Sequence, residues 1–400
     1  MRVGFAAQSA VFTLLFILAV VSLLTWILLT FFRGGFWHVQ RYNADFETID
    51  APAAWPRVLA IIPARNEADT IGPVLKSLLE QSYAGEYRVI VVDDHSEDRT
   101  VLVARATAQS AGRAATISII SAAILPDRWT GKLWAMQQGV EASATFSPDY
   151  FWFTDADILH APDTLARLIE RAEKQHLGLT SLMVLLEAKS FAERLLIPPF
   201  LYFFLKLYPP QWIADAKAKT AGAAGGCILI QRKTLAQIGG LTAIHSEVID
   251  DCALARAVKD GGGAIWMGLT RKSVSLRAYT SLGEIRDLIA RTAFTQLGYS
   301  TFLLFCTLFG MLLTYAAPVA LTFSTQSTLW RLGLTAWTLM TITYLPTIRF
   351  YGLSPVWAPA LPLAAVFYSY ATWISAVRYW LGKGGQWKGR AQAMSNQGSA

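Results

Sequence analysis

Two carboxylates that lie close together in the segment FWFTDADILH are the first candidates for chemistry in this sequence. Asp155 and Asp157 come directly after an apolar run that is expected to be a buried strand, and a helix is expected to begin near Asp163. Hard divalent cations such as Mg²⁺ or Mn²⁺ prefer carboxylate and phosphate oxygens to nitrogen or sulfur ligands. The pair therefore predicts a metal site that could bridge a diphosphate. The alternative is that Asp163 only caps the helix and that the other two acids are ordinary loop residues.

Two further polar clusters follow apolar runs, RNE at 65–67 and DDH at 93–95. An acid at a strand end can bind a ribose hydroxyl or a base N–H. The alternative for the second cluster is helix capping, in which Asp94, Ser96 or Asp98 caps the next helix. No GxGxxG or GxxxxGK[ST] motif lies near these strands, which argues against dinucleotide and P-loop chemistry.

The elements that must position these side chains are short apolar runs that alternate with amphipathic segments. The runs RVLAIIPA, YRVIVVDD, ATISIISA and DYFWFTDAD are rich in Val, Ile, Phe and Trp, and segments such as ADTIGPVLKSLLEQ and GKLWAMQQGVEA separate them. Strands that alternate with helices predict an α/β domain with a mostly parallel sheet. Ligands of such sheets bind beyond the carboxyl ends of the strands, where the polar clusters are expected to lie.

Composition indicates a membrane-associated protein. Charged residues make up only 16% of the 400 residues, below the roughly 25% of an ordinary soluble domain, and the apolar excess lies at the two ends of the chain. The net charge is +7. Cys227, Cys252 and Cys306 are scattered and have no CxxC spacing, so neither a disulfide framework nor a zinc site is indicated.

Residues 8–32 are predicted to form a transmembrane anchor. The stretch Ala10–Phe32 carries no charge and is long enough to cross a hydrocarbon core of roughly 30 Å as a helix. A signal peptide is the alternative, but the stretch exceeds the usual apolar length of one and no small-residue cleavage site follows promptly. Arg33 and Arg41 follow the stretch and only Arg2 precedes it, which by the positive-inside rule places the next domain in the cytoplasm.

The C-terminal region 300–380 is predicted to be a second membrane region, and 381–400 a polar tail. Its apolar stretches are 301–323, 329–348 and 358–377. Three crossings would put the basic residues that follow outside the cell, which the positive-inside rule disfavours. Prolines crowd the last stretch, so a broken or re-entrant segment is an alternative to a crossing, and the number of crossings stays open.

The segment 190–213 mixes aromatic and apolar residues with several prolines and a few charges. Glu193, Arg194 and Lys206 interrupt it, so it is too broken to span a bilayer. Aromatic and basic residues together favour a helix that lies in the membrane interface, where a lipid could reach the site. A buried core helix is the alternative.

Taken together, these motifs resemble the family 2 glycosyltransferases with the GT-A fold over about residues 55 to 300. IIPARNEADTIGPVL resembles the first nucleotide-binding loop of that family, VVDDHSEDRT the second, LPDRWTGKLWAMQQG its Gly-Lys helix, and TDADI its metal-binding DxD motif. AGAAGGCILIQRKTLAQIGGL resembles the acceptor-side glycine loop with its strand, and VIDDCALARAVKDGGG the helix that bears the catalytic base. The anchor, RWTGKLWA and ARTAFTQLGYS resemble more narrowly the hopanoid-biosynthesis-associated glycosyltransferases, relatives of the ceramide glucosyltransferases.

The resemblance implies a GT-A domain at 50–299, with a Rossmann-like and mostly parallel sheet, between the two membrane regions. It implies Asp251 as the catalytic base, with Asp250 where the family usually has Glu. The alternative is that both acids only begin a helix, where negative charge is worth about 0.3 to 1 kcal/mol. The implied donor-binding residues are Pro63, Arg65, Glu67, Asp93, Asp94, Lys132 and Asp155, the metal ligands are Asp157 and Asp155, and the acceptor loop contains Gly225 and Gly226.

The family's QxxRW motif is incomplete in this chain. Leu288 occupies the Gln position and Thr292 the Trp position, so only Arg291 remains. Arg291 is expected either to meet the diphosphate as part of the catalytic site or to cap a helix near the membrane. The departure weakens an assignment to processive polymer synthesis.

We therefore expect a metal-dependent inverting hexosyltransferase, with Mg²⁺ or Mn²⁺, bound to the inner membrane by several helices and facing the cytoplasm. It would transfer a sugar from a nucleotide sugar, with a UDP-sugar as the expected donor, to a lipid hydroxyl, with a hopanoid as the favoured acceptor. No nucleic-acid partner is expected. The alternatives are a family 2 polysaccharide synthase, which should have an intact QxxRW, and a non-catalytic scaffold, which should have lost its carboxylates. The transferred sugar and the oligomeric state stay open.

Overall fold

The computed structural model describes residues 2–46, 51–112, 116–383, 386–387 and 390–391. The chain divides into two compact units, which we describe separately. The sheet domain comprises Tyr42–Glu187 and Trp212–Ala278, and the helical unit comprises Met1–Arg41, Ala188–Gln211 and Tyr279–Leu381. Residue 50, where the domain was predicted to begin, and most of the predicted tail lie outside the described residues.

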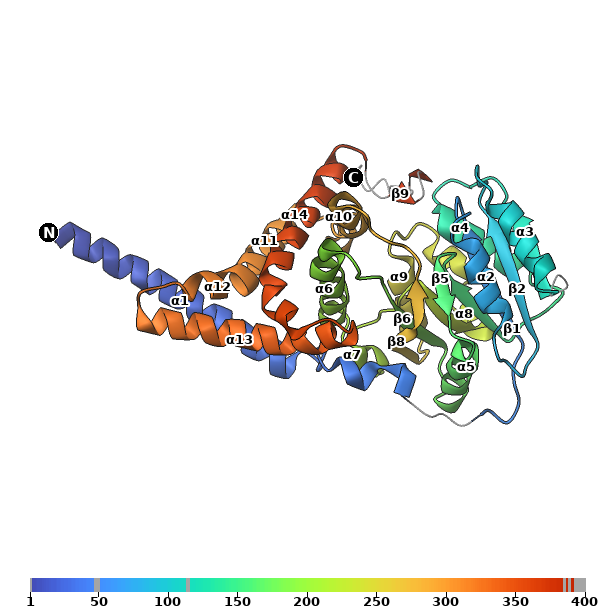
Figure 1. The fold of residues 1–400 in the computed structure, drawn as a ribbon, viewed down its shortest axis with the longest axis horizontal. Helices are drawn as coiled ribbons and strands as arrows, with labels where there is room; N and C mark the ends of the chain where they lie inside the picture. The colour runs from blue at the N-terminus through green and yellow to red at the C-terminus, as the bar shows by residue number, and fades with distance from the viewer. Residues whose placement is uncertain (1, 47–50, 113–115, 384–385, 388–389, 392–400) are drawn as a thin grey trace. The chain divides into compact units, whose positions relative to one another are not determined.

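A mixed eight-stranded sheet forms the centre of the sheet domain (Figure 1). Its strand order is β3-β2-β1-β4-β7-β6-β8-β5. The pairs β1/β2, β1/β4, β2/β3 and β6/β8 are parallel, and β4/β7, β6/β7 and β5/β8 are antiparallel. The prediction of a mostly parallel α/β sheet is confirmed. The strands are β1 Val58–Ala64, β2 Tyr87–Asp93, β3 Ile117–Ser121, β4 Tyr150–Thr154, β5 Ile158–His160, β6 Leu179–Leu185, β7 Cys227–Gln231 and β8 Ile265–Ser275, with a separate pair β9 Gln386–Trp387 and β10 Arg390–Ala391.

Helices pack against this sheet. Because they cover it, its central strands consist of continuous apolar residues. All residues of β1 and β4 are buried, as expected where helices cover both faces of a sheet. Gly139 brings α4 close to β1, because a Cβ atom there would lie 2.5 Å from Ile61 Cγ2. The helices of the domain are α2 Ile71–Leu79, α3 Thr100–Ser110, α4 Gly131–Glu141, α5 Thr164–Lys174, α8 Arg232–Gln237 and α9 Asp250–Asp260, while α7 Pro210–Ala214 spans the sequence boundary between the units.

Strand register brings the predicted polar clusters to one edge of the sheet. Ala64 at the end of β1 pairs with Asp93 at the end of β2, and Asp93 pairs with Ser121 at the end of β3. On the other side of β1, Thr154 at the end of β4 lies opposite Cys227, the first residue of antiparallel β7. The loop that precedes β7 therefore lies at the same edge as the segment that follows β4.

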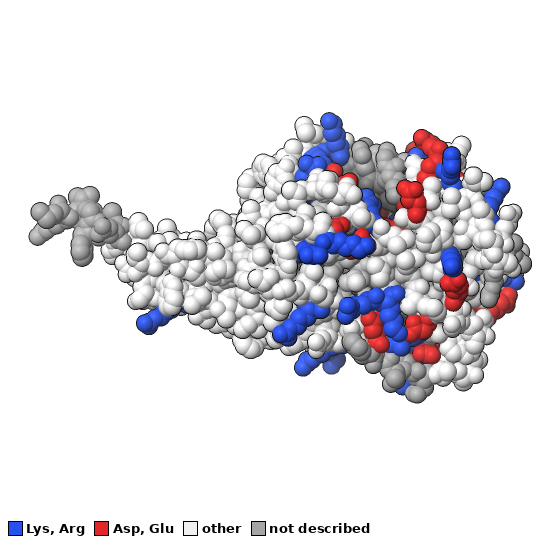
Figure 2. Space-filling view, viewed as in Figure 1, with Lys and Arg blue, Asp and Glu red and all other residues white. Residues whose placement is uncertain are grey.

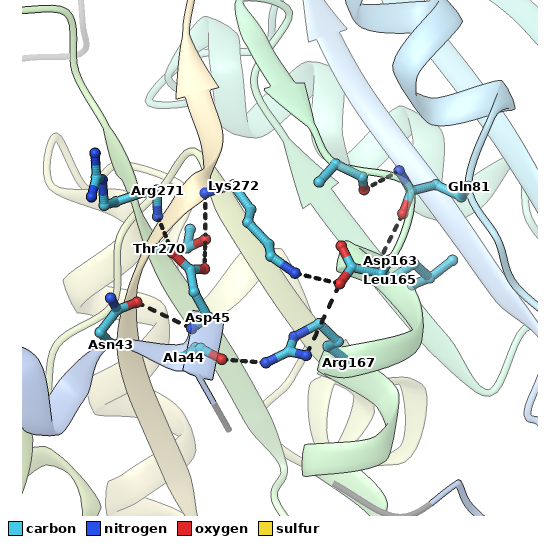
Figure 3. A network of polar contacts seen from close by, with 11 residues as sticks. Asn43, Ala44, Asp45, Gln81, Asp163, Leu165, Arg167, Thr270, Arg271 and Lys272 are labelled. Atoms are coloured by element: carbon cyan, nitrogen blue, oxygen red, sulfur yellow. Dashed lines mark hydrogen bonds and ion pairs between the residues drawn. The ribbon is translucent and has the colours of Figure 1, made fainter. Parts of the chain in front are cut away.

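A polar network ties the segment that enters the sheet domain to β8 and α5 (Figure 3). The carboxylate of Asp45 accepts hydrogen bonds from Thr270 Oγ1 at 2.6 Å and from Arg271 N at 2.8 Å. Asp163 accepts from Lys272 Nζ at 2.6 Å and forms no side-chain cap on α5. Asp163 thus occupies the N-cap position of α5, as the alternative expected, but its side chain makes no capping hydrogen bond and instead joins α5 to β8.

The helical unit contains three segments that are long and apolar enough to cross a membrane, counted over the described residues. They are Ser9–Phe32, Thr301–Leu321 and Pro355–Trp380, and the surface over α1 and α13 in Figure 2 shows almost no charged side chains. The stretch at 329–348 is helical but is not among these segments. The prolines of the last stretch lie at its start, so they leave α14 unbroken. The elements are α1 Arg2–Phe32, η1 Val39–Tyr42, α6 Phe191–Leu207, α10 Leu282–Ala290, η5 Thr295–Leu297, α11 Thr301–Met311, a π-helical turn Leu312–Ala316, α12 Ala317–Leu321, α13 Ser327–Phe350, η7 Pro355–Ala360 and α14 Leu361–Trp380.

Helix α6 is a core helix of this unit. Its start is held by a capping box between Ser190 and Glu193, and Glu193 also accepts a hydrogen bond from Tyr279 N at 2.9 Å. Tyr202 and Phe203 are buried, and the Tyr202 hydroxyl lies 2.9 Å from Thr343 Oγ1 of α13. The middle of the segment 190–213 is therefore buried within the helical unit, as the alternative of a core helix expected.

The close approach of α4 to β1 predicts that Gly139→Val destabilises the sheet domain. The added side chain would collide with Ile61, and overpacking of this kind costs about 1 to 3 kcal/mol. Thermal unfolding of the purified chain should show a lower midpoint for Gly139→Val. The exposed Glu141→Ala on the same helix is the control and should change stability by no more than about 0.5 kcal/mol. An unchanged midpoint for Gly139→Val would show that the helix has room to shift.

Candidate active site

Lys132 lies at the centre of the polar cluster at the sheet edge. It is the second residue of α4, whose N-cap is Thr130. Its Nζ atom lies 2.8 Å from Asp155 Oδ1 and 3.6 Å from Asp250 Oδ2. The side chains of Lys132 and Asp250 are 17% and 19% exposed, and that of Asp155 is 35% exposed. Three residues that are far apart in the sequence thus form one charged cluster that still reaches solvent.

Asp251 joins this cluster through the loop before β7. Its Oδ2 atom accepts a hydrogen bond from Gly225 N at 2.8 Å, and its Oδ1 atom accepts one from Cys252 N at 2.7 Å. A Cβ atom on Gly225 would lie 3.3 Å from both Asp251 Oδ2 and Lys132 Nζ. A side chain at position 225 would therefore make tight contacts with the carboxylate of Asp251 and the ammonium of Lys132, and one or both would have to shift.

The charges of this cluster shift the pKa values of its members in opposite ways. Burial and the neighbouring Asp250 carboxylate raise the pKa of Asp251 to about 6, although Lys132 opposes the change. Burial lowers the pKa of Lys132, but Asp155 and Asp250 raise it by more, so the ammonium stays charged. A carboxylate with a pKa near the working pH can take up a proton and release it again. The cluster thus pairs a permanent cation with a carboxylate suited to proton transfer.

The predicted donor-side residues lie at the ends of β1 and β2. Arg65 donates to the carbonyl oxygens of Asp94 at 2.6 Å and His95 at 3.1 Å, and its Nη1 lies 3.9 Å from Asp94 Oδ2. Asp94 is fully buried, and Asp93 is 6% exposed and accepts from Ser96 N at 3.3 Å. The Arg65 and Asp94 pair therefore joins the two strand ends.

Pro63 and Glu67 flank this pair on the first strand end. Pro63 is buried within β1. The Glu67 carboxylate accepts from the Thr70 hydroxyl at 3.1 Å, and its backbone N–H donates to Thr100 Oγ1 at 2.7 Å. These contacts hold the loop between β1 and α2 against the start of α3. Donor contact by any of these five residues stays a prediction.

Asp155 and Asp157 lie in the turn between β4 and β5, and their chemistry fits a divalent cation. Leu276 N donates to the carbonyl oxygen of Asp157 at 2.7 Å, which fixes this turn against the chain after β8. The described residues contain no cluster of three or more His, Cys, Asp or Glu side chains that could hold a metal alone. Mg²⁺ sites in proteins are commonly built from one or two carboxylates plus substrate phosphates and water. A site of that kind needs no third side chain.

Gly226 lies in the sheet domain, whereas Arg291 lies in the helical unit. Gly226 follows Gly225 in the loop before β7, and its carbonyl accepts a hydrogen bond from Thr154 Oγ1 at 3.1 Å. Arg291 is the exposed residue that ends α10 in the helical unit. The sheet domain brings together Lys132, Asp155, Asp250, Asp251 and Gly225. Arg291 belongs to the other unit, and its part in catalysis stays a prediction.

Sequence reasoning missed residues that hold the site loops in place. Thr130 N donates to His245 O at 3.0 Å, and the Trp129 ring lies 5.6 Å from that of His245. Lys259 on α9 donates to the carbonyl oxygens of Trp212, Ile213 and Thr220. No local pattern marks such residues, because their partners are backbone atoms far away in the sequence.

Comparisons with known proteins agree with this geometry. Residues 59–239 match the family model "Glycosyl transferase family 2". The 4,4'-diaponeurosporenoate glycosyltransferase of Staphylococcus haemolyticus is 33% identical over 156 residues, which cover 38% of this chain and 39% of that protein. The undecaprenyl-phosphate 4-deoxy-4-formamido-L-arabinose transferase of Edwardsiella ictaluri is 29% identical over 133 residues, which cover 33% of this chain and 36% of that protein. The matches thus span less than half the length of these relatives.

A solved structure with a similar fold covers most of the chain. The mannosyltransferase PcManGT from Pyrobaculum calidifontis, in complex with GDP-Man and Mn²⁺, aligns with a TM-score of 0.57 and 19% identity over 89% of this chain and 99% of that one. At this identity the likeness shows the fold, and the mixed α/β sheet of this chain is GT-A-like. Residues 59–239, slightly less than half of this chain, are thus similar to glycosyl transferase family 2.

Proposed function

We propose that this chain is a membrane-bound inverting glycosyltransferase that moves a sugar from a nucleotide sugar to a lipid hydroxyl. The observation that carries the proposal is the meeting of Asp251, Lys132 and Asp155 at the carboxyl edge of the sheet. A proton acceptor and a cation thus lie beside a carboxylate pair that suits a metal-bound diphosphate. The geometry makes a scaffold without catalysis the weaker alternative, because the carboxylates are retained and held in place.

Asp251 is the proposed base. As the acceptor oxygen attacks the anomeric carbon, the bond from that carbon to the diphosphate oxygen breaks and the hydroxyl proton passes to Asp251. The N–H groups of Gly225 and Cys252 hold the carboxylate in one orientation. A single displacement inverts the anomeric centre, so no covalent sugar–enzyme intermediate is needed.

Asp157 and Asp155 would hold the divalent cation, Mg²⁺ or Mn²⁺, and that cation would neutralise charge on the departing diphosphate. Lys132 bonds to Asp155 and keeps it in place. The Mn²⁺ and GDP-Man bound to the archaeal mannosyltransferase support a metal and a nucleotide sugar as partners. We propose a UDP-sugar as the donor, on the resemblance noted in the sequence, with Arg65, Glu67, Asp93 and Asp94 around the nucleotide.

The proposed acceptor is a lipid, with a hopanoid as the favoured class. Both relatives described above are named for polyprenyl or lipid-type molecules, and within the described part of the chain three helical segments are long and apolar enough to span a membrane. In the helical unit, Phe191 is 73% exposed and lies 5.2 Å from the ring of Trp357, beside Val356, which is 72% exposed. We propose that this exposed apolar patch meets the lipid phase. The choice of hopanoid rests on family resemblance.

The proposed location is the inner membrane, with several crossings and the sheet domain in the cytoplasm. Arg33 and Arg41 follow the first apolar helix, as the positive-inside rule expects of a cytoplasmic flank. Cys227, Cys252 and Cys306 are all free thiols, which is compatible with a reducing compartment.

Removal of the Asp157 carboxylate should abolish both transfer and metal-dependent nucleotide binding. Asp157→Ala takes away the ligand that would hold the cation against the diphosphate. Calorimetric titration of UDP in the presence of Mn²⁺ should then show no metal-dependent gain in affinity. Asp163→Asn, in the nearby segment after β5, is the control and should bind like the wild type. Full transfer activity after EDTA treatment would contradict a role for the metal.

The base should give the reaction a characteristic pH dependence. Because the pKa of Asp251 is raised to about 6, its carboxylate form falls as the pH drops through that value. The wild-type kcat/KM should therefore fall below about pH 6 and level off above it. Asp251→Asn should lower the rate by about 10²- to 10⁴-fold while UDP affinity stays near normal. Asp260→Asn, at the exposed end of α9, should retain activity, and an Asp251→Asn variant with normal turnover would remove Asp251 from the mechanism.

Analysis of the membrane lipids of cells should identify the acceptor. Cells with the wild-type chain should contain a hydroxylated hopanoid that is heavier by one sugar residue, and cells with Asp251→Asn should lack it, as measured by mass spectrometry. Phe191→Ser should raise the acceptor KM more than the donor KM. A ladder of many sugars would favour the polysaccharide synthase. Transfer to another lipid alone would replace the acceptor class and leave the mechanism standing.

A further inference from the structure

His160 is a buried histidine that sits among neutral partners beneath the proposed active site. It ends the short strand β5 and is 4% exposed. Its Nε2 atom lies 2.8 Å from Thr154 Oγ1, and its Nδ1 atom lies 2.9 Å from Ser273 Oγ. The ring also lies 4.7 Å from that of Trp152. Both ring nitrogens therefore have hydrogen-bond partners, as expected of a buried polar side chain.

The hydrogen bonds of Thr154 decide which ring nitrogen carries the proton. The Thr154 hydroxyl has one proton, and it donates that proton to the carbonyl oxygen of Gly226 at 3.1 Å. Its oxygen must then accept from His160, so the ring proton lies on Nε2. The Nδ1 atom of His160 is left as an acceptor for the hydroxyl of Ser273. All bonds in this series run one way, from Ser273 through His160 and Thr154 to Gly226.

Thr154 and Gly226, the last two residues of this series, each adjoin one half of the site. Thr154 is the last residue of β4 and directly precedes Asp155, which binds Lys132. Gly226 directly follows Gly225, whose N–H holds the Asp251 carboxylate. Movement of Thr154 would therefore disturb the start of the carboxylate turn and the loop of the base together.

We propose that His160, as its Nε2–H tautomer, is a positioning residue that fixes Thr154 and through it both the Asp155 turn and the Gly225–Gly226 loop. The roles of Asp155 and Asp251 in this inference rest on the proposed function. The tautomer itself does not. Burial also lowers the pKa of His160 to about 3, so the ring stays neutral throughout the physiological range and the direction of the bonds is preserved.

The tautomer can be tested without any assay of transfer. Nitrogen-15 NMR of the full chain in detergent distinguishes a protonated from an unprotonated ring nitrogen, and the loss of a signal in His160→Gln assigns the residue. We expect a proton on Nε2 and none on Nδ1 from neutral pH down to about 5, where an exposed histidine with a pKa near 6.5 is mostly protonated. A proton on Nδ1, or titration within that interval, would overturn the inference.

The positioning role can be tested by the shape of the pH profile. Thr154→Val keeps the side-chain shape but cannot donate to Gly226, so the Gly225 N–H should hold Asp251 less well. Since that N–H lowers the pKa of Asp251, the fall in kcat/KM should move to higher pH, with Asp250 and Lys132 still facing the carboxylate. Supporting groups of this kind typically cost about 10- to 100-fold when removed, so we expect a loss in kcat/KM of that size.

Conservative and matched variants separate positioning from simple stability. Thr154→Ser keeps the hydroxyl and should restore most of the activity and the wild-type pH profile. Ser273→Ala removes the donor to Nδ1 but leaves Thr154 as the acceptor for Nε2, so the ring proton should stay on Nε2 in the NMR spectrum of this variant, which tests the assignment even if Thr154→Val fails to fold. A Thr154→Val protein that melts like the wild type and keeps its pH profile would overturn the role. If the wild type shows the expected tautomer but no transfer, the proposed function has failed and the tautomer assignment stands.

Discussion

The burial of one ammonium group among carboxylates is the interaction on which the site depends. Lys132 lies 2.8 Å from Asp155 and 3.6 Å from Asp250, and Asp251 is close enough to influence its pKa. Uncompensated burial of any of these charges would be costly, so each residue needs the others in place. The positive charge of Lys132 also offsets the mutual repulsion of the carboxylates. One lysine thus lies among the carboxylates of the proposed base and the proposed metal-binding pair within one small region.

The sheet brings these charged residues together because its strands run in two directions. Parallel β1, β2 and β4 deliver Arg65, Asp94 and Asp155 at their carboxyl ends, and antiparallel β7 begins at the same edge, so the loop before it faces them. That loop approaches within backbone hydrogen-bonding distance of Asp251, and a Cβ atom at position 225 would make a tight contact of 3.3 Å with Asp251 Oδ2. The carboxylates and the loop are therefore one unit, and the buried hydroxyl of Thr154 joins them.

The helical unit suits a lipid-facing role in a different way. Its core is rich in aromatic side chains. Buried hydrogen bonds stabilise this core: the Tyr202 hydroxyl lies near Thr343 Oγ1, and the Tyr368 hydroxyl donates to Leu196 O. Its long apolar helices leave many large side chains exposed, which in a soluble protein would favour aggregation. A bilayer would cover this apolar surface, as the proposed membrane location requires. The unit therefore supports an acceptor that resides in the membrane.

The sequence by itself determined the residue chemistry and the local elements. Apolar runs of strand length and amphipathic segments predicted β1 to β4, α2 and α4, and the acids and the lysine of the site could be named, because side-chain chemistry and periodicity are local properties. Only the tertiary structure decided that the side chain of Asp163 binds Lys272 and makes no capping bond to α5, that the middle of α6 is buried, and that His160 bonds to Thr154 and Ser273. These outcomes depend on which strands pair and which faces pack. The contacts join residues that are far apart in the sequence, in some cases by more than a hundred positions, so they leave no local sequence pattern.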